Sequence, residues 1–195
     1  IESVCWPAIA ESGFDPDRIW SAIARCRNRG AGAQAVAAVD IALHDLAGKA
    51  TGQPVWRLLG AEAGNPVKCN ATVPAANPAQ LRALAERWAE AGFDTFKLKA
   101  GLAGDVAQVA MVREVVGPQA RLRVDANAAW SVGVAIERLG AMARYSLELA
   151  EQPVGGLEQM AEVRRASRVR IAADEDIVTR RDARRAYELR ACELA

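Results

Sequence analysis

Short β-type segments alternate with amphipathic helical segments from Val67 onward, and this alternation constrains the fold more than any other feature of the sequence. In each repeat, a short apolar run is followed by a longer segment whose apolar residues recur at helical spacing. The expected strand and helix pairs are 69–73 with 78–91, 95–99 with 105–116, 122–125 with 132–143, 147–151 with 157–166, and 169–173 with 181–189. Five such units in succession predict an α/β fold built on a parallel sheet or a barrel.

Two architectures suit this pattern, an open doubly wound sheet and a closed (β/α) barrel of the TIM type. An open nucleotide-binding sheet usually carries a glycine-rich phosphate loop after a strand. No G-x-G-x-x-G or Walker sequence occurs in this chain, and Gly155-Gly156 is interpreted as a turn. We therefore expect residues 63–195 to supply the first five to six units of a barrel, which is incomplete because a full barrel takes about 250 residues.

Residues 1–62 have a different texture, and a separate helical segment is expected there. Asp15-Pro16-Asp17 supplies a helix N-cap with proline in the first turn, and residues 35–50 form a long alanine-rich run. Apolar side chains recur in this run at helical spacing, at Ala38, Ile41, Ala42 and Leu46. Their periodicity predicts that this face of the helix packs against another element.

The composition favours a small molecule as the partner. Lys plus Arg number 25 and Asp plus Glu number 24, so the net charge of +1 gives no sign of binding to nucleic acid or to an anionic membrane. The four cysteines are far apart and no stretch approaches about 18 uncharged apolar residues, so no zinc site, disulfide framework or membrane span is indicated. A cytoplasmic location is expected. The oligomeric state is left open, with a homo-oligomer as one alternative.

A charged residue suited to catalysis stands at the end of four successive predicted strands. The steps from Lys99 to Asp125 to Glu151 to Asp174 are 26, 26 and 23 residues. Because the C-terminal ends of barrel strands converge on one face, these side chains are expected to share one pocket. Lys97 lies on the same face as Lys99. Two neighbouring ammonium groups that are partly buried should lower a lysine pKa, which suits a general base.

The three acids are the candidate ligands of a metal ion. Carboxylate oxygens suit Mg²⁺, and three buried carboxylates without a cation would be costly. The run Asp174-Glu175-Asp176 leaves open which acid binds, with Asp174 and Asp176 expected on one face and Glu175 pointing away. Such a site stabilises the enediolate that forms when a base, here Lys99, removes a proton next to a carboxylate. A Schiff-base aldolase, which needs one buried lysine and no metal, is an alternative.

At these residues the sequence resembles the enolase superfamily, and specifically its muconate-lactonizing subgroup. The resemblance is carried by AVDIALHDLAGK at 38–49, by PVWRLLG at 54–60, and by the lysine and acidic motifs of the predicted strands. It implies a TIM-type barrel preceded by an α+β capping domain, of which residues 1–62 are the helical remnant. It also implies that Lys97-x-Lys99 is the paired-lysine motif, with Lys99 as catalytic acid/base, and that Asp125, Glu151 and Asp174 bind Mg²⁺.

Within this subgroup the resemblance points to o-succinylbenzoate synthase. Residues 70–75 and 171–174 are similar to segments of actinobacterial-type synthases. In that case proton abstraction by Lys99 and loss of hydroxide would yield the aromatic product used for menaquinone. Muconate cycloisomerases and epimerases of dipeptides or N-acylamino acids share the same motifs and remain alternatives.

The resemblance also implies elements outside the printed sequence. Members of the subgroup carry another catalytic lysine at the end of the next strand, which is expected a few residues beyond Ala195, and N-terminal strands are expected before Ile1. The chain therefore resembles the middle of an enzyme. A truncated, noncatalytic barrel fragment is the alternative from another class of protein, because an incomplete barrel leaves sheet edges unpaired.

Overall fold

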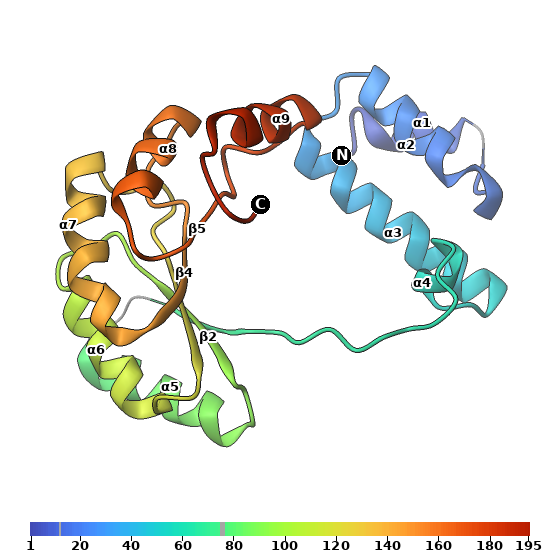
Figure 1. Cartoon of the computed structure of the whole chain (residues 1–195). Coiled ribbons are helices and arrows are strands. Elements are labelled where there is room, and N and C mark those ends of the chain that lie inside the picture. The colour runs from blue at the N-terminus through green and yellow to red at the C-terminus, as the bar shows by residue number, and fades with distance from the viewer. Residues whose placement is uncertain (12, 75–76) are drawn as a thin grey trace. The chain divides into compact units, whose positions relative to one another are not determined.

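The computed structural model describes residues 1–11, 13–74 and 77–195, which form two compact units, Ile1–Val67 and Lys68–Ala195 (Figure 1). Each unit has an apolar core of its own. Ala75, which ends the segment 70–75 singled out in the sequence, lies outside the described residues. Within the described ranges, no helix is long and apolar enough to cross a membrane.

The first unit is helical, as the sequence predicts. Its elements are α1 (Cys5–Ala10), the 3-10 helix η1 (Pro16–Arg18), α2 (Ile19–Asn28), α3 (Ala33–Thr51) and α4 (Val55–Leu58). The Asp15 side chain accepts a hydrogen bond from the Asp17 N–H at 2.9 Å and caps η1. Helix α3 ends at Thr51, and the next residue, Gly52, adopts a left-handed φ of 65° at little steric cost.

The buried face of α3 is not the one predicted. Ala38, Ile41, Ala42 and Leu46 are exposed, and Ile41 is 72% accessible to solvent. The helix instead buries Val36, Val39, Leu43 and Ala47 in the core shared with α1 and α2. In an alanine-rich helix, two neighbouring stripes have similar apolar character, so the sequence pattern does not distinguish the stripe that the packing partner covers.

The second unit is a five-stranded parallel sheet whose strands alternate with helices. The strands are β1 (Ala71–Val73), β2 (Thr95–Lys99), β3 (Arg121–Asp125), β4 (Leu147–Glu151) and β5 (Ile171–Ala172). The helices are α5 (Pro78–Glu90), α6 (Asp105–Val116), α7 (Val132–Met142), α8 (Leu157–Ala166) and α9 (Arg180–Leu189), with η2 (Ala143–Tyr145) after α7. The strands pair in chain order, β1-β2-β3-β4-β5. A doubly wound sheet would reverse its order at a switch point, so the sequential order is that of a barrel segment.

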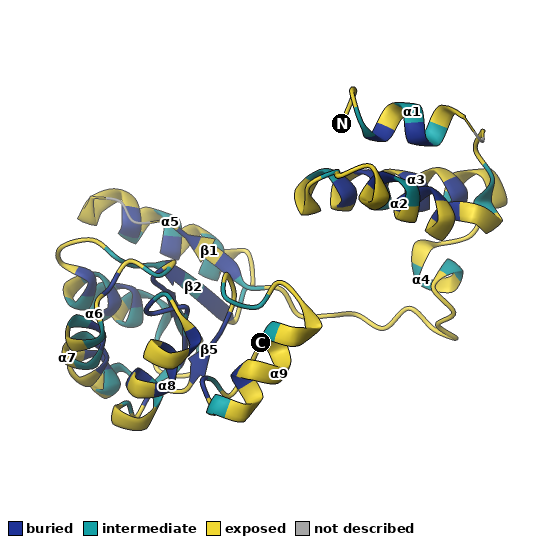
Figure 2. Ribbon diagram, turned by 90° about the horizontal axis from the view of Figure 1, so that it is seen from above, coloured by how far each residue is buried: buried dark blue, intermediate teal, exposed yellow. Residues whose placement is uncertain are grey.

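The helices cover one side of this sheet. Helices α5 to α8 follow one another along it, each in contact with the next (Figure 1). Figure 2 shows that the strands are largely buried, whereas the helices keep an exposed outer face. In β2 and β3 the fully buried apolar residues Phe96, Leu98, Leu122 and Val124 alternate with charged ones. This alternation directs the charged side chains to the opposite face of the sheet.

Candidate active site

Strand register places the predicted site residues in one row. Lys99 pairs with Asp125, Asp125 pairs with Glu151, and Glu151 pairs with Ala172. In a parallel sheet, residues paired in this way have side chains on the same face. Asp174 follows two residues after Ala172, so it lies just past the end of this row.

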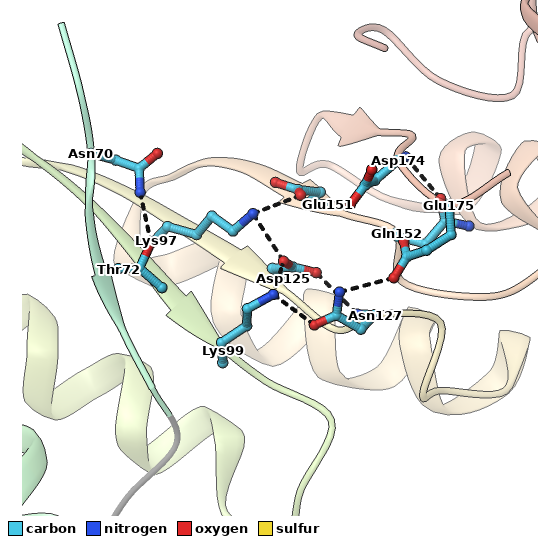
Figure 3. A network of polar contacts seen from close by, with 10 residues as sticks. All are labelled: Asn70, Thr72, Lys97, Lys99, Asp125, Asn127, Glu151, Gln152, Asp174 and Glu175. Carbon is cyan, nitrogen blue, oxygen red and sulfur yellow. Dashed lines mark hydrogen bonds and ion pairs between the residues drawn. The ribbon is translucent and has the colours of Figure 1, made fainter. Parts of the chain in front are cut away.

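The two lysines and two of the acids form a tight cluster of opposite charges (Figure 3). Lys97 Nζ lies 2.9 Å from Asp125 Oδ2 and donates to Glu151 Oε1 at 2.7 Å. Lys99 Nζ donates to the same Asp125 oxygen at 2.6 Å and to Asn127 Oδ1 at 2.8 Å. The Asp125 side chain is fully buried and also accepts the Asn127 N–H at 3.0 Å. The structure therefore brings together Lys97, Lys99, Asp125 and Glu151.

The electrostatics of this cluster differ from the sequence prediction at Lys97. Burial acts to lower the pKa of Lys97, but hydrogen bonds and charges from Glu151 and Asp125 outweigh it and raise the pKa above its ordinary value. The pKa of Asp125 is likewise pushed up by burial, but hydrogen bonds from Lys99 and Lys97 hold it below its usual range. The carboxylates of β3 and β4, in addition to the neighbouring ammonium group, therefore determine the direction in which the pKa of Lys97 shifts.

The same cluster tests whether these residues suit a metal ion. Among the residues that the structure describes, no three acidic, cysteine or histidine side chains are grouped closely enough to hold one. Asp125 and Glu151 do converge, since oxygens of both lie within 2.9 Å of Lys97 Nζ. The ammonium group marks a point that both carboxylates reach, and oxygen donors of this kind are the ligands that Mg²⁺ prefers. These two residues fit Mg²⁺, with Asp174 placed next along the edge.

The three consecutive acids after β5 have three different environments. Asp176 Oδ2 accepts the Gln152 Nε2–H and the Gly156 N–H, both at 2.7 Å. Glu175 Oε1 accepts the Asn127 Nδ2–H at 2.9 Å, so it faces the lysine cluster and does not point away as predicted. Strand β5 ends at Ala172, so the two-residue alternation used for that prediction does not extend to Glu175.

The carboxylate of Asp174 is the one that stays available. Asp174 uses its backbone N–H, which donates to Gln152 Oε1 at 2.9 Å. Within the described ranges, no hydrogen bond or ion pair engages its carboxylate. Of the three acids, Asp174 is therefore the one whose oxygens are free to contact a further group.

Gln152 is the residue at this site that the sequence reasoning missed. It follows Glu151 directly, is fully buried, and contacts both Asp174 and Asp176. A glutamine before a proline carries no charge signal, and its place beside β5 depends on contacts 22 and 24 residues away along the chain. The available sequence signal was its position next to a predicted ligand.

A parallel sheet in chain order, with lysines and acids at the C-terminal strand ends, is the arrangement found in a segment of a (β/α) barrel. Residues 80–195 match the family described as enolase C-terminal domain-like. Residues 12–60 match the mandelate racemase / muconate lactonizing enzyme N-terminal domain. The chain belongs to the enolase superfamily, in its mandelate racemase / muconate lactonizing enzyme branch.

Curated relatives carry the names of several enzymes. D-Ala-D/L-Ala epimerase of Cytophaga hutchinsonii is 34% identical over 80% of this chain and 44% of its own length. The o-succinylbenzoate synthase of Thermobifida fusca is 38% identical over 66% of this chain and 41% of its own length. The chain thus spans less than half the length of these two relatives.

The crystal structure of one relative contains a metal ion and a dipeptide. The dipeptide epimerase of Cytophaga hutchinsonii, described as complexed with Mg and the dipeptide D-Ala-L-Val, superposes with a TM-score of 0.79 at 32% identity. The match covers 93% of this chain and 50% of the solved one.

Proposed function

We propose that this chain carries the proton-abstraction half of a Mg²⁺-dependent enzyme acting on a small carboxylate substrate. The observation that carries the proposal is the cluster in which Asp125 Oδ2 lies 2.6 Å from Lys99 Nζ and 2.9 Å from Lys97 Nζ. In this proposal, Lys99 is a base that lies next to two carboxylates able to contribute to a metal site. A solved relative named as a Mg complex supports the choice of metal.

Each residue of the cluster has a role in this proposal. Lys99, the more exposed of the two lysines, removes the proton next to the substrate carboxylate. Lys97 keeps Asp125 and Glu151 together and partly balances their charge. Asp125, Glu151 and Asp174 would hold Mg²⁺, which when bound offsets the negative charge of the deprotonated substrate.

We propose a class of substrate and, within that class, two specific candidates. The common element is an acid with an acidic hydrogen next to its carboxylate. The similarity of residues 70–75 and 171–174 favours o-succinylbenzoate synthesis, and a relative of that name is 38% identical. A dipeptide is the second candidate, because the solved relative with Mg holds D-Ala-L-Val and a curated relative of the same organism is named as a D-Ala-D/L-Ala epimerase.

The test follows removal of the substrate α-proton in D₂O by NMR, as deuterium exchange for a panel of dipeptides and as formation of the aromatic product for the precursor of o-succinylbenzoate. Lys99→Ala should abolish exchange and leave Mg²⁺ binding intact, because Lys99 is the base and not a ligand. Lys68→Ala removes an exposed lysine that pairs with Asp94, and exchange should continue in this control. Unchanged exchange in Lys99→Ala would refute the assigned role.

Metal dependence separates the alternatives. Removal of Mg²⁺ with EDTA should stop the exchange, and added Mg²⁺ should restore it. A Schiff-base aldolase would keep its activity in EDTA and would be trapped by borohydride in the presence of substrate. A native chain that binds Mg²⁺ but neither exchanges nor removes the α-proton of any substrate in the panel would favour the noncatalytic fragment.

A further inference from the structure

Gln152 is a fully buried polar residue with a saturated set of hydrogen bonds. Its Nε2 donates to Val154 O at 2.8 Å and to Asp176 Oδ2 at 2.7 Å. Its Oε1 accepts the Asp174 N–H at 2.9 Å and the Asp176 N–H at 3.5 Å. A carboxamide has two donor hydrogens and two acceptor lone pairs, so every hydrogen-bonding position of this side chain is used.

The backbone of Gln152 joins the same strand ends. Its N–H donates to Ala172 O at 2.8 Å, and its carbonyl accepts the Ala128 N–H at 2.8 Å. Its backbone φ is +37°, in the left-handed region that residues other than glycine rarely adopt. A strained residue kept at this position indicates that its surroundings over-determine its conformation.

Glutamate and methionine, which are close to glutamine in length, could not make all these contacts. Glutamate would set a second carboxylate against Asp176 and against the Val154 carbonyl, while methionine would leave both backbone N–H groups of the turn without their acceptor. The carboxamide thus ties the 174–176 turn to the end of β4. It holds the turn through the backbone N–H groups of Asp174 and Asp176 and through the Asp176 carboxylate, and it makes no contact with the Asp174 carboxylate.

We propose that Gln152 is the positioning residue for the Asp174 carboxylate. Its buried carboxamide fixes the 174–176 turn, engages the Asp176 carboxylate as an anchor, and so presents Asp174 rather than Asp176 to a cation beside Asp125 and Glu151. This inference rests on the proposed function, because it concerns the same Mg²⁺ site. It assigns Asp176 a structural role and explains why Asp174, and not Asp176, is the candidate ligand.

The test measures the Mg²⁺ dissociation constant of the full chain by isothermal titration calorimetry. Gln152→Met keeps the length of the side chain and removes its donors and acceptors. We expect the dissociation constant to rise by about ten- to a hundredfold, the range seen when a residue that orients a metal ligand is lost. A purely structural role would lower the melting temperature and leave the Mg²⁺ affinity of the folded protein unchanged.

Gln108→Met is the matched control. Gln108 lies on α6, is partly buried, and has a side-chain oxygen with no hydrogen-bond partner in the part of the chain that the structure describes. The same chemical change there should leave the dissociation constant as it is. Asp176→Asn is a milder second variant, to be used if circular dichroism shows that Gln152→Met does not fold, and it should weaken binding in the same direction.

Asp174→Ala distinguishes failure of the positioning role of Gln152 from failure of the proposed Mg²⁺ ligand set. If Asp174→Ala weakens Mg²⁺ binding and the folded Gln152 or Asp176 variant binds as tightly as the native chain, the positioning role is overturned and the proposed function stands. If the native chain binds no Mg²⁺, or Asp174→Ala binds it unchanged, the proposed ligand set fails and this inference fails with it.

Discussion

The Asp125 carboxylate accepts hydrogen bonds from Lys99 and from the Asn127 backbone and pairs with Lys97, although its side chain has no solvent exposure. A buried acid in this position depends on its partners, because an unpaired charge there would be strongly disfavoured. The two lysines depend on it in turn. The lysines and carboxylates of the site therefore neutralise one another, and each charged group is stabilised by its partners.

Asp125→Asn should destabilise the fold. The amide must turn one donor toward the ammonium groups or toward the Asn127 N–H, so charge-assisted hydrogen bonds are lost at a buried position. We expect the free energy of unfolding to fall by about 2 kcal/mol, measured by urea denaturation. Asp94→Asn is the control, because Asp94 pairs with Lys68 at the surface, where solvent screens the two charges, and its loss should be clearly smaller. Equal losses in the two variants would contradict the prediction.

At the scale of residues, the sequence could predict what strand alternation and regular spacing determine. These rules placed Lys97, Lys99, Asp125 and Glu151 on one face, and the structure brings these four together. They failed at Glu175, where the strand has already ended, and at the pKa of Lys97, which depends on carboxylates of two other strands. Both failures concern contacts that only the fold creates.

Among the elements, the loop after β2 is anchored by a buried acid. Asp105, the first residue of α6, is 1% exposed and accepts the N–H groups of Gly101 and Leu102 at 3.1 and 3.2 Å. It also accepts the Trp130 Nε1–H at 3.2 Å and pairs with Arg138. This carboxylate links the loop that follows Lys99 to the loop that follows Asp125, so it holds together two strand ends of the site.

Asp105→Ala should loosen that loop and weaken the fold. Removal of one member of this charge pair leaves two backbone N–H groups without their acceptor, and it leaves Arg138 with the Leu102 carbonyl in place of a carboxylate. We expect a loss of about 3 kcal/mol in the free energy of unfolding. Amide hydrogen exchange at Gly101 and Leu102 should also become faster.

Trp130→Phe provides the comparison for this variant. It removes one donor from the Asp105 carboxylate and keeps most of the aromatic packing, so it should cost only about 1 kcal/mol. If Asp105→Ala leaves the exchange at Gly101 and Leu102 unchanged, the carboxylate does not anchor the loop.

The order of strands and helices was easier to predict from the sequence than the face of each helix that is buried. The five strand and helix pairs expected from residues 69–189 all occur. Hydrophobic periodicity and turn residues, on which that prediction was based, are local properties of the sequence. Helix α1 was not predicted, since Cys5–Ala10 contains a proline and is short. The buried face of α3 was assigned wrongly, because the choice between two apolar stripes depends on α1 and α2, which lie elsewhere in the chain.

On the scale of the whole molecule, two cores divide the chain. One gathers buried residues between Cys5 and Ala47, and the other gathers buried residues between Ala71 and Ala191. Residues 61–69, which connect them, are exposed and contain no helix or strand. A segment of this kind has few contacts to lose when it opens, so it is the expected place for a protease to cut first.

Limited digestion with a glutamate-specific protease should therefore cut first after Glu62. Intact-mass spectrometry should show the fragments 1–62 and 63–195 before any smaller product. The helical circular dichroism signal should persist after the cut, because each piece keeps the core that stabilises it. Glu62→Gln removes the site and should delay the first cleavage. Early cleavage at Glu114 or Glu137, inside helices α6 and α7, would instead show that the barrel unit opens as readily as the connecting segment.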